Sequence, residues 1–251
     1  MRKRGLVKLL SDPELLTLPT VHENLGFDEA MLVDADENDR GPLLRLWEQN
    51  DYAVVLGSSR RLAKEVDVDA CREDGVAIAR RTSGGGTVVI GPGALNVSVV
   101  LAMDYAPEMV TVDGTQAYVL GRIAEALRAR GPAVEVKGSG DLTIAGRKFS
   151  GSAQRRLRRR ALVHATILHE FSISRISRYL RIPERRPEYR ADRTHEDFLM
   201  NVPLGRKILI ESLRSAWPEA ALLTTASDVP QDLLETLCPG KFSDRSWIER
   251  L

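Results

Sequence analysis

The stretch Arg80-Arg81-Thr82-Ser83-Gly84-Gly85-Gly86-Thr87 is the most informative part of the sequence. Its Gly/Ser and cationic character returns in Gly146-Arg147-Lys148-Phe149-Ser150-Gly151-Ser152-Ala153. Glycine lets the backbone approach a ligand closely and adopt conformations that are closed to other residues. Main-chain N–H groups and small hydroxyls can then bind anionic oxygens, while Arg or Lys supplies the countercharge. A triple glycine alone is compatible with a plain turn, but the two loops together predict a site for a phosphorylated or carboxylated small molecule.

The segments around these loops predict both strands and helices. Strands are expected at residues 43–47, 51–57, 76–79, 87–90, 95–101, 141–144, 147–150 and 163–171. Helices are expected at residues 24–35, 61–74, 115–130, 203–217 and 231–238, the first with its acidic residues facing outward. Runs of strands punctuated by a few helices favour an α+β fold over a doubly wound one. The expected architecture is a mixed, largely antiparallel β-sheet flanked by helices.

Two short connections predict β-hairpins. Gly91-Pro92-Gly93 separates the strands expected at residues 87–90 and 95–101, and Ala145-Gly146 separates those at residues 141–144 and 147–150. The second hairpin would carry the second glycine loop.

The composition restricts the classes of partner. Of 251 residues, 43% are hydrophobic and 28% are charged, and 36 basic against 35 acidic residues give a net charge of +1. Such a balance provides no overall field that would favour nucleic acid or a membrane surface. The two cysteines, Cys71 and Cys238, form neither a CxxC motif nor a disulfide framework. The basic start has too short an apolar stretch for a signal peptide, and no window approaches the roughly 18 apolar residues of a membrane span. A cytoplasmic protein is expected.

Four segments resemble, in order, the motifs of lipoate–protein ligases. Residues 80–86 resemble the RRxSGGG loop, and residues 140–154 (GDLTIAGRKFSGSAQ) resemble the NDIxxxGKKISGSAQ hairpin. Residues 163–168 (VHATIL) are similar to the HHGTLL strand, and residues 189–199 (YRADRTHEDFL) are similar to the YR..R.H.DFL segment. The resemblance implies the biotin/lipoate ligase catalytic fold.

The resemblance also implies a chemistry. A ligase of this family would activate lipoate with Mg-ATP to lipoyl-adenylate and transfer the lipoyl group to a lysine of a lipoyl-carrier protein domain. Because the first step brings two anions together, cations and Mg²⁺ must offset their repulsion. Lys148 matches the family's essential lysine and is the predicted catalytic residue, with its ammonium on the acyl carbonyl or bridging oxygen. Arg81 matches the loop arginine. Asp141 matches the hairpin aspartate and is the candidate metal ligand.

Each candidate also has a structural interpretation. Arg81 could be a surface charge beside a turn, Lys148 a solvated hairpin residue, Asp141 a turn residue at a strand start and His164 a core histidine. His195 is expected to be structural. The run Arg155-Arg156-Leu157-Arg158-Arg159-Arg160 is expected to be a solvated loop or phosphate-facing edge rather than a nucleic-acid site. The further predicted substrate- and nucleotide-binding residues are Ser83, Gly84, Gly85, Gly86, Thr87, Asn96, Ser150, Gly151, Ser152, Ala153, His164 and Thr166.

The sequence departs from the family pattern at the edge of this site. The family often continues the glycine loop to a His-Asp pair and an Asn, where this chain has Ile90, Gly91 and Ala94. Asn96 could compensate for the missing polar contacts. The Asn before the hairpin aspartate is Gly140 here, and the glycine after the strand histidine is Ala165.

Two rival functions remain. An octanoyltransferase of the same fold moves an acyl group between carrier proteins through a cysteine thioester. Neither Cys71 nor Cys238 falls where such enzymes place their cysteine, and Gly86 stands where one transferase group tends to carry Arg, which favours the ligase. A transferase that needs no cysteine stays open. A non-catalytic lipoate-binding module would not require Lys148.

The domain prediction is one catalytic domain over residues 1–251. It includes a short helical C-terminal extension at about residues 203–251, which is too small for a full accessory domain. Any boundary would lie near residues 183–205. The chain is therefore expected to be a self-sufficient compact ligase or the catalytic half of a ligase with a separate accessory subunit. Specificity for lipoate over octanoate is left open, and a monomer is assumed.

Overall fold

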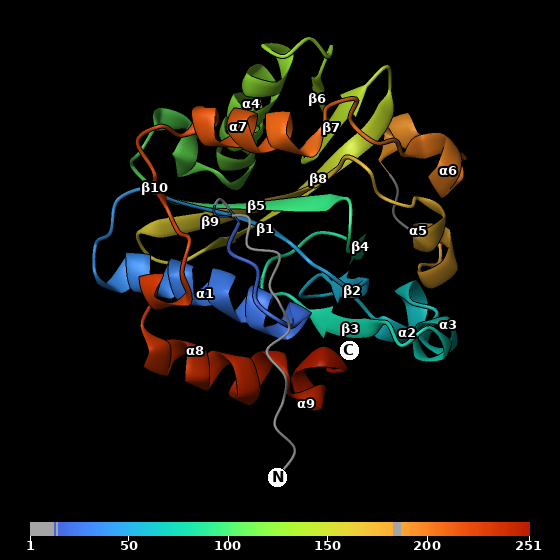
Figure 1. The fold of residues 1–251 in the computed structure, drawn as a ribbon, viewed down its shortest axis with the longest axis horizontal. Coiled ribbons are helices and arrows are strands. Elements are labelled where there is room, and N and C mark those ends of the chain that lie inside the picture. Colours follow the sequence, from blue (N-terminus) through green and yellow to red (C-terminus); the bar gives the residue numbers. More distant parts are fainter. Residues whose placement is uncertain (1–12, 14, 183–186) are drawn as a thin grey trace.

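Two β-sheets form the centre of the structure, a computed structural model that describes residue 13 and residues 15–182 and 187–251 (Figure 1). The larger sheet has the order β10-β1-β5-β9-β8-β7-β6, and the smaller has the order β3-β2-β4. The larger contains β1 (Leu43–Glu48), β5 (Ala94–Ala102), β6 (Glu135–Lys137), β7 (Asp141–Ile144), β8 (Arg147–Arg156), β9 (Arg160–Leu168) and β10 (Ala221–Leu222). The smaller contains β2 (Ala53–Leu56), β3 (Ala77–Arg80) and β4 (Val88–Ile90). Among the described strands, β1 with β10 and β2 with β3 pair in parallel and the other pairs are antiparallel, which confirms the predicted α+β fold with a mixed, largely antiparallel sheet.

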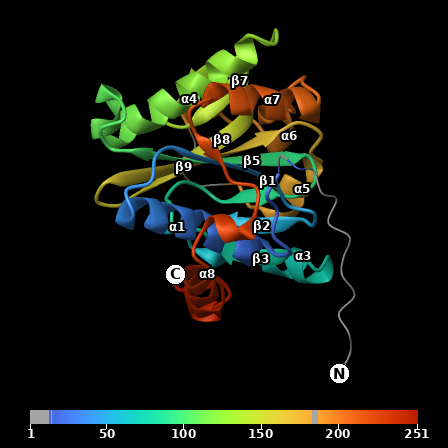
Figure 2. The same cartoon turned by 60° about the vertical axis from the view of Figure 1, so that its left-hand side comes forward.

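Helices cover both faces of the larger sheet (Figures 1 and 2). The helices α4 (Val112–Arg128) and α7 (Arg206–Ala216) pack together on one face, and α1 (Val21–Glu37) packs on the other. The helix α8 (Gln231–Leu237) lies outside α1, so that α1 is enclosed between the sheet and α8. The remaining helical segments are short: α2 (Leu62–Glu65), α3 (Val68–Glu73), α5 (Ser174–Tyr179), α6 (His195–Phe198), α9 (Arg245–Ile248), η1 (Pro107–Val110), η2 (Glu188–Arg190), η3 (Ala226–Asp228) and η4 (Cys238–Phe242).

The first helix is more buried than its sequence indicates. It begins at a capping box in which Thr20 and Glu23 satisfy each other's backbone N–H groups. The expectation that its acidic residues face outward is wrong for Asp28, Glu29 and Asp34, all of which are buried. Because α8 and η4 cover the face of α1 opposite the sheet, carboxylates on both faces are enclosed and need partners inside the protein.

The predicted hairpin around Gly91-Pro92-Gly93 is also wrong. The strand β4 pairs with β2 in the smaller sheet, whereas β5 pairs with β1 and β9 in the larger one. The glycines form the passage between sheets. Gly93 has φ of +83°, and a Cβ there would lie 2.4 Å from the carbonyl carbon of Glu170. The turn at Ala145-Gly146, in contrast, is a hairpin as predicted, and both residues have positive φ.

The single helix expected at residues 61–74 is two short helices. Val66 forms an isolated β-bridge with Leu180, which interrupts the helical hydrogen bonds after α2. Asp67 then accepts a hydrogen bond from the N–H of Ala70 at 2.9 Å and caps α3.

The arginine run extends from the end of β8 through the turn to the first residue of β9, and several of its side chains bond neighbouring segments. Arg159 donates to the carbonyl of Asp36 at the C-terminal end of α1, where a cation also complements the helix dipole. Arg160 forms an ion pair with Asp39 at 2.6 Å, and Arg156 donates to carbonyls of η1. The expectation of a solvated loop fits Arg155, Arg158 and Arg159, which are exposed, whereas Arg160 is buried and serves packing.

The C-terminal part of the chain is distributed over the molecule. The helix α7 lies beside α4, β10 adds a strand to the edge of the larger sheet, and α8 and α9 lie beyond α1 (Figure 1). Residues 183–186, which belong to the region where any domain boundary is expected, lie outside the described residues, as does the basic start. In the part of the chain that the structure describes, no helix has the length and apolar character needed to cross a membrane.

Candidate active site

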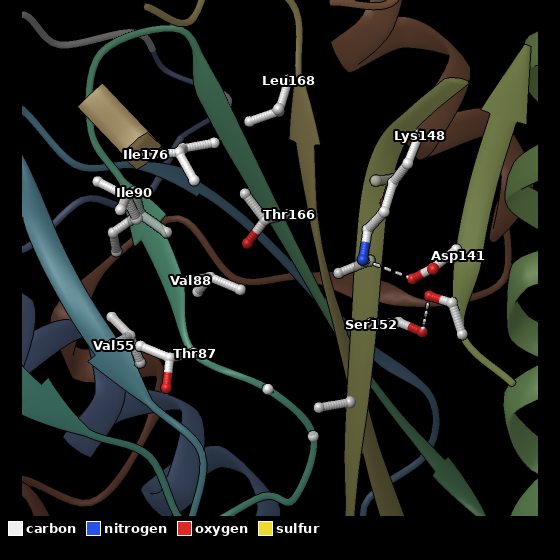
Figure 3. Close-up of a pocket in the computed structure, with 18 of the residues that line it drawn as sticks. Val55, Thr87, Val88, Ile90, Asp141, Lys148, Ser152, Thr166, Leu168 and Ile176 are labelled. Atoms are coloured by element: carbon white, nitrogen blue, oxygen red, sulfur yellow. Dashed lines mark hydrogen bonds and ion pairs between the residues drawn. The ribbon is translucent and has the colours of Figure 1, made fainter. Parts of the chain in front are cut away.

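A pocket of about 530 Å³ lies between the two sheets. In Figure 3, Val55, Val88, Ile90 and Ile176 gather on one side of the pocket, and Lys148 with its neighbours lies across from them. One wall is thus aliphatic and the opposite wall is polar.

Most of the predicted site residues line this pocket. They are Arg81, Gly85, Gly86, Thr87, Asn96, Asp141, Lys148, Ser150, Gly151, Ser152, Ala153, His164 and Thr166. Ser83 and Gly84 are not among the residues that line the pocket. The Ser83 side chain is buried, and the Gly84 carbonyl accepts a hydrogen bond from Arg81 at 2.6 Å. The two motifs, distant in sequence, are therefore brought to one cavity.

Lys148 is held by a carboxylate on the neighbouring strand. Its Nζ lies 2.6 Å from Oδ1 of Asp141, and the Tyr189 hydroxyl donates to Oδ2 of the same carboxylate at 2.6 Å. Burial raises the pKa of Tyr189, and the hydrogen bond to Asp141 raises it further, so the phenol stays a donor. A Cβ at Gly151 would lie 2.9 Å from Nζ of Lys148. Glycine at that position therefore leaves room for the ammonium.

Arg81 organises the first glycine loop from within. Its guanidinium donates to the carbonyls of Gly84 at 2.6 Å and Gly86 at 2.7 Å, and to the Ser83 hydroxyl at 3.0 Å. Burial lowers the pKa of Arg81 to about 10, with a smaller contribution from Arg60, so the side chain remains a cation at neutral pH. The structural interpretation of Arg81 as a surface charge is wrong, since the residue is 7% exposed.

His164 connects the pocket to a buried ionic network. Its Nε2 lies 2.6 Å from the Ser83 hydroxyl, and its Nδ1 lies 3.7 Å from Oδ2 of Asp28. Asp28 forms an ion pair with fully buried Arg45 at 2.7 Å and accepts a hydrogen bond from Ser98. Burial alone would raise the pKa of Asp28, but Arg45, His164 and Ser98 together lower it. His164 is thus both a partnered interior residue and part of the pocket wall.

Some polar contacts remain on the part of the pocket wall where the sequence departs from the family pattern. Thr166 donates to Oδ1 of Asn96 at 2.7 Å, while Ile90 beside them makes the surface apolar. At the other end, a Cβ at Gly140 would lie 2.4 Å from Nε2 of Gln116, which donates to Ser152 at 2.7 Å. The amide of Gln116 therefore occupies the space beside position 140.

Sequence reasoning missed several lining residues. Arg60 donates to the carbonyl of Gly85 at 2.8 Å and pairs with Glu65 at 3.2 Å, and Glu65 also accepts from Thr87. Glu65 belongs to the segment 61–74, whose pattern indicated only a helix, and Arg60 directly precedes it, after Gly57-Ser58-Ser59, which is a glycine loop in its own right. His195, expected to be structural, lines the pocket as well, and burial, aided by Arg190, lowers its pKa.

Neither cysteine of the sequence lines the pocket. Cys71 is 1% exposed, and burial raises the pKa of its thiol to about 11, with Asp67 and Asp74 adding to the effect. Burial also raises the pKa of Cys238, which packs against Gly26 of α1. Both thiols are therefore poorly suited to form a reactive thiolate.

The described residues do not build a metal site by themselves. Within them, no group of three or more His, Cys, Asp or Glu side chains converges closely enough to hold an ion. Asp141, the candidate metal ligand, has one oxygen engaged by Lys148 and the other by Tyr189.

The fold and this lysine-bearing pocket define a catalytic domain of the biotin/lipoate ligase type. Residues 20–216 match the family described as the lipoyl protein ligase A/B catalytic domain, and the chain belongs to that family.

The relatives include both ligases and transferases. A putative lipoate-protein ligase A of Aeropyrum pernix is 30% identical over 241 residues, which cover 90% of this chain and 87% of that protein. Lipoate-protein ligase A subunit 1 of Thermoplasma acidophilum is 25% identical, with 89% and 90% covered. Octanoyltransferase LipM of Symbiobacterium thermophilum is 27% identical, with 89% and 86% covered. In contrast, the match to a probable lipoate-protein ligase A of Mycoplasma pneumoniae spans 45% of that protein.

Solved structures confirm the fold. The structure of a bi-partite lipoate protein ligase from Thermoplasma acidophilum superimposes with a TM-score of 0.77 at 24% identity, covering 94% of each chain. A lipoate-protein ligase A bound with ATP gives a TM-score of 0.76 at 24% identity, covering 94% of this chain and 98% of that chain. A Thermoplasma acidophilum putative lipoate protein ligase with bound lipoic acid gives 0.76 at 22% identity, covering 94% of this chain and 97% of that chain.

Proposed function

We propose that this chain is a lipoate–protein ligase. It activates lipoate with Mg-ATP to lipoyl-adenylate and transfers the lipoyl group to a specific lysine of a carrier domain. The observation that carries the proposal is the pocket itself, in which a lysine held by a carboxylate faces an aliphatic wall and no cysteine contributes to the lining.

The charges of the pocket suit two anionic substrates. Among the residues that the structure describes, its lining contains five Lys and Arg side chains against two carboxylates, Glu65 and Asp141. In the first step, an oxygen of the lipoate carboxylate attacks the α-phosphorus of ATP, and the bond to the leaving pyrophosphate breaks. Two anions must approach each other for this attack, and the excess of cations offsets their repulsion. The cationic lining residues are Arg60, Arg81, Lys148, Arg181 and Arg190.

Lys148 serves the second step. The neutral amine of the acceptor lysine attacks the acyl carbon, a proton is lost from that nitrogen, and the bond to the AMP oxygen breaks. Negative charge grows on the acyl oxygen and then on the departing phosphate. The ammonium of Lys148, fixed by Asp141, can stabilise that charge without first having to be ordered.

The aliphatic wall suits the acyl chain. Val55, Val88, Ile90, Leu168 and Ile176 contribute apolar surface opposite Lys148 (Figure 3). Burying each methylene of an acyl chain against such a surface contributes roughly 0.8 kcal/mol. Lipoate with its carboxyl group at Lys148 and its chain along this wall is the orientation that we propose.

The donor set fits Mg²⁺ that arrives as part of the ATP complex. Magnesium in nucleotide sites is usually held by substrate phosphates, water and one or two carboxylates. Asp141 and Glu65 are the carboxylates that line the described part of the pocket, and both already have cationic partners. Asp141 remains the candidate protein ligand. The charge that Mg²⁺ supplies would assist the first step.

The rival transferase shares the fold, and the likeness to LipM favours keeping it as the second candidate. A transferase that works through a thioester needs a thiolate beside the essential lysine. Cys71 is buried, Cys238 is partly buried, and neither lines the pocket, which argues against that mechanism.

We further propose that the partner is a lipoyl-carrier domain and that a separate accessory subunit assists the adenylation step. The Thermoplasma acidophilum relative, which matches this chain over nearly its whole length, is called subunit 1, and the related structure is described as a bi-partite ligase with its E2 lipoyl domain. The lipoate- and ATP-bound structures of the same fold support these two substrates.

Mass spectrometry of an apo lipoyl domain tests the proposal. The protein is incubated with that domain, lipoate and Mg-ATP, and parallel reactions omit ATP, replace lipoate with octanoyl-carrier protein, or use Lys148→Ala. A lipoyl mass shift that requires both ATP and Lys148 supports the ligase. If the shift appears only with preformed lipoyl-adenylate, the transfer step is supported and adenylation needs the accessory subunit. Transfer from octanoyl-carrier without ATP would establish the transferase, and no shift in any reaction would indicate a binding role.

A further inference from the structure

The C-terminal segment, residues 241–250, contacts the start of the first glycine loop through a reciprocal pair. The Arg80 side chain donates to the main-chain carbonyls of Trp247 at 3.1 Å and Ile248 at 2.9 Å. In return, the indole N–H of Trp247 donates to the carbonyl of Arg80 at 2.9 Å. Arg80 is the last residue of β3 and directly precedes Arg81, which lines the pocket.

Arg80 also contacts a second loop, residues 57–60. Its Nη1 donates to the carbonyls of Gly57 at 3.0 Å and Arg60 at 2.7 Å. The loop 57–60 in turn touches the glycine loop: Ser58 N–H donates to the Ser83 carbonyl at 2.9 Å, and Arg60 donates to the Gly85 carbonyl at 2.8 Å. The two loops at the pocket are thus joined to each other and, through Arg80, to the C-terminal segment.

The same segment makes two further contacts with these loops. Arg250 donates to the carbonyl of Ser58, and its guanidinium lies 4.0 Å from the centre of the Trp247 ring. Lys241, at the start of the segment, forms an ion pair with Glu29 at 3.0 Å. Glu29 also accepts a hydrogen bond from Thr82, the residue after Arg81. The residues on both sides of Arg81 are therefore held, directly or through Glu29, by residues 241–250.

Burial makes these contacts costly to lose. Arg80 is 0% exposed, and a buried guanidinium that loses its acceptors leaves charged donors without partners. Without the carbonyls of Trp247 and Ile248, Arg80 would have to move, and its hold on the carbonyls of Gly57 and Arg60 would change with it. The family match ends at residue 216, so the segment lies outside the part of the chain that matches the family.

We propose that residues 241–250 are a positioning element for the pocket, which holds loop 57–60 and the glycine loop in the conformation that binds substrate. Because the coupling of two binding events is reciprocal, substrate in the pocket should in turn stabilise the segment. The role in loop order stands on the contacts alone, whereas the role in catalysis rests on the proposed function.

Hydrogen exchange of the full chain tests the role in loop order separately from the role in catalysis. We compare Trp247→Ala, Trp247→Phe and the control Arg245→Ala, whose side chain lies on the same helix and pairs only with Glu249 among the described residues. Trp247→Ala should speed amide exchange in residues 57–60 and 82–87 by about tenfold and leave β5 and β9 unchanged. Trp247→Phe, which keeps an aromatic ring but lacks the indole N–H, should give a smaller effect. Arg245→Ala should give none. Lipoate with Mg-ATP should slow exchange in residues 244–249 of the unmodified protein.

Kinetics provide the second readout. If only the ordered loops bind substrate, the apparent affinity falls in proportion to their population. Trp247→Ala should therefore raise KM for lipoate and ATP by about tenfold while kcat changes by less than about twofold. Unchanged exchange in the two loops, or a uniform increase over the whole chain, would overturn the positioning role. Failure of ligation in the unmodified protein would overturn the proposed function and leave the exchange result valid.

Discussion

The Lys148 ammonium lies 2.6 Å from Oδ1 of Asp141, and the Tyr189 hydroxyl lies 2.6 Å from Oδ2 of the same carboxylate. Lys148 lies on β8, Asp141 on β7 and Tyr189 on η2. Two strands of the larger sheet and the segment η2 therefore hold the Lys148 ammonium at the pocket wall. An ion pair with a hydrogen-bonded carboxylate is pre-organised, since neither side chain has to find its conformation when substrate binds. This arrangement supports the proposal that Lys148, a partly exposed hairpin residue, is the catalytic lysine.

Replacement of this lysine should abolish most ligation without unfolding the protein. Lys148→Ala removes one pre-organised donor, and such losses lower the rate by roughly 100- to 1000-fold. Its side chain is 26% exposed, so the melting temperature should change little. Initial rates of lipoyl transfer and thermal melting measure the two effects. Lys137→Ala, on the edge strand β6 and paired with Glu135, is the matched control and should retain full activity.

Loss of the tyrosine hydroxyl should weaken catalysis through Asp141. Tyr189→Phe removes a hydrogen bond to a carboxylate, and such bonds contribute about 1.5–3 kcal/mol. The expected decrease in kcat is roughly tenfold, with little change in KM for ATP. A normal kcat in this variant would mean that Lys148 keeps its position without the hydroxyl.

The same variant should alter the alkaline stability of the protein. The folded pKa of Tyr189 is raised, chiefly by burial, above the value of about 10 for a free tyrosine. The protonated phenol is therefore favoured by the fold, and its contribution is present below pH 10 and lost as the pH rises towards the folded pKa. Denaturant unfolding at pH 8 and pH 11 should show a smaller decrease for Tyr189→Phe than for the unmodified protein. Equal decreases in the two proteins would contradict the assignment.

Local sequence signals predicted those features correctly that depend on neighbouring residues alone. The hairpin at Ala145-Gly146 has the two-residue turn that its pattern indicates, and the motifs around Arg81 and Lys148 meet at one pocket. The prediction of a hairpin at Gly91-Pro92-Gly93 is wrong because the two strands beside it belong to different sheets. A turn signal indicates that the chain changes direction and does not reveal which strand lies alongside.

Long-range partners could not be read from the sequence. Asp28 is buried against the larger sheet, where its partners Ser98 and His164 come from β5 and β9, far along the chain. The contact between Arg80 and Trp247 likewise joins residues 167 positions apart. Arg60 and Glu65 carry no motif of their own, and only the packing of loop 57–60 on the glycine loop brings them to the pocket.

The glycine loop offers a matched pair of substitutions. Gly85 has φ of +86°, and a Cβ there would lie 2.9 Å from Nη2 of Arg81, whereas a Cβ at Gly84 meets nothing within 4 Å. A left-handed backbone costs other residues about 1–2 kcal/mol. Gly85→Ala should therefore lower both stability and ligation, while Gly84→Ala should be nearly neutral. Urea unfolding and initial rates test the pair, and equal effects at the two positions would show that the loop is not held in this conformation.

A carboxylate away from the pocket should govern part of the acid stability. Burial alone would raise the pKa of Glu48, but His169, the N–H of Gly93 and Arg206 lower it to about 2. Because the folded pKa lies below the ordinary value of 4.5, the contribution is present above that pH and is lost as the pH falls towards 2. It amounts to at most about 3 kcal/mol. Glu48→Gln should be clearly less stable at pH 7, and the difference should shrink by pH 2 to 3. A difference that does not depend on pH would contradict this account.

Removal of both thiols distinguishes the two acyl-transfer mechanisms directly. Cys71 and Cys238 lie outside the pocket lining, and burial raises the pKa of each, so neither should carry an acyl group. The double variant Cys71→Ala/Cys238→Ala should ligate lipoate within about twofold of the normal rate, although the loss of buried Cys71 should lower stability by about 1 kcal/mol. Intact-mass analysis of the unmodified protein during turnover should show no acyl adduct. A thioester on either cysteine, or an inactive but folded double variant, would establish the transferase instead, because only that mechanism passes the acyl group through sulfur.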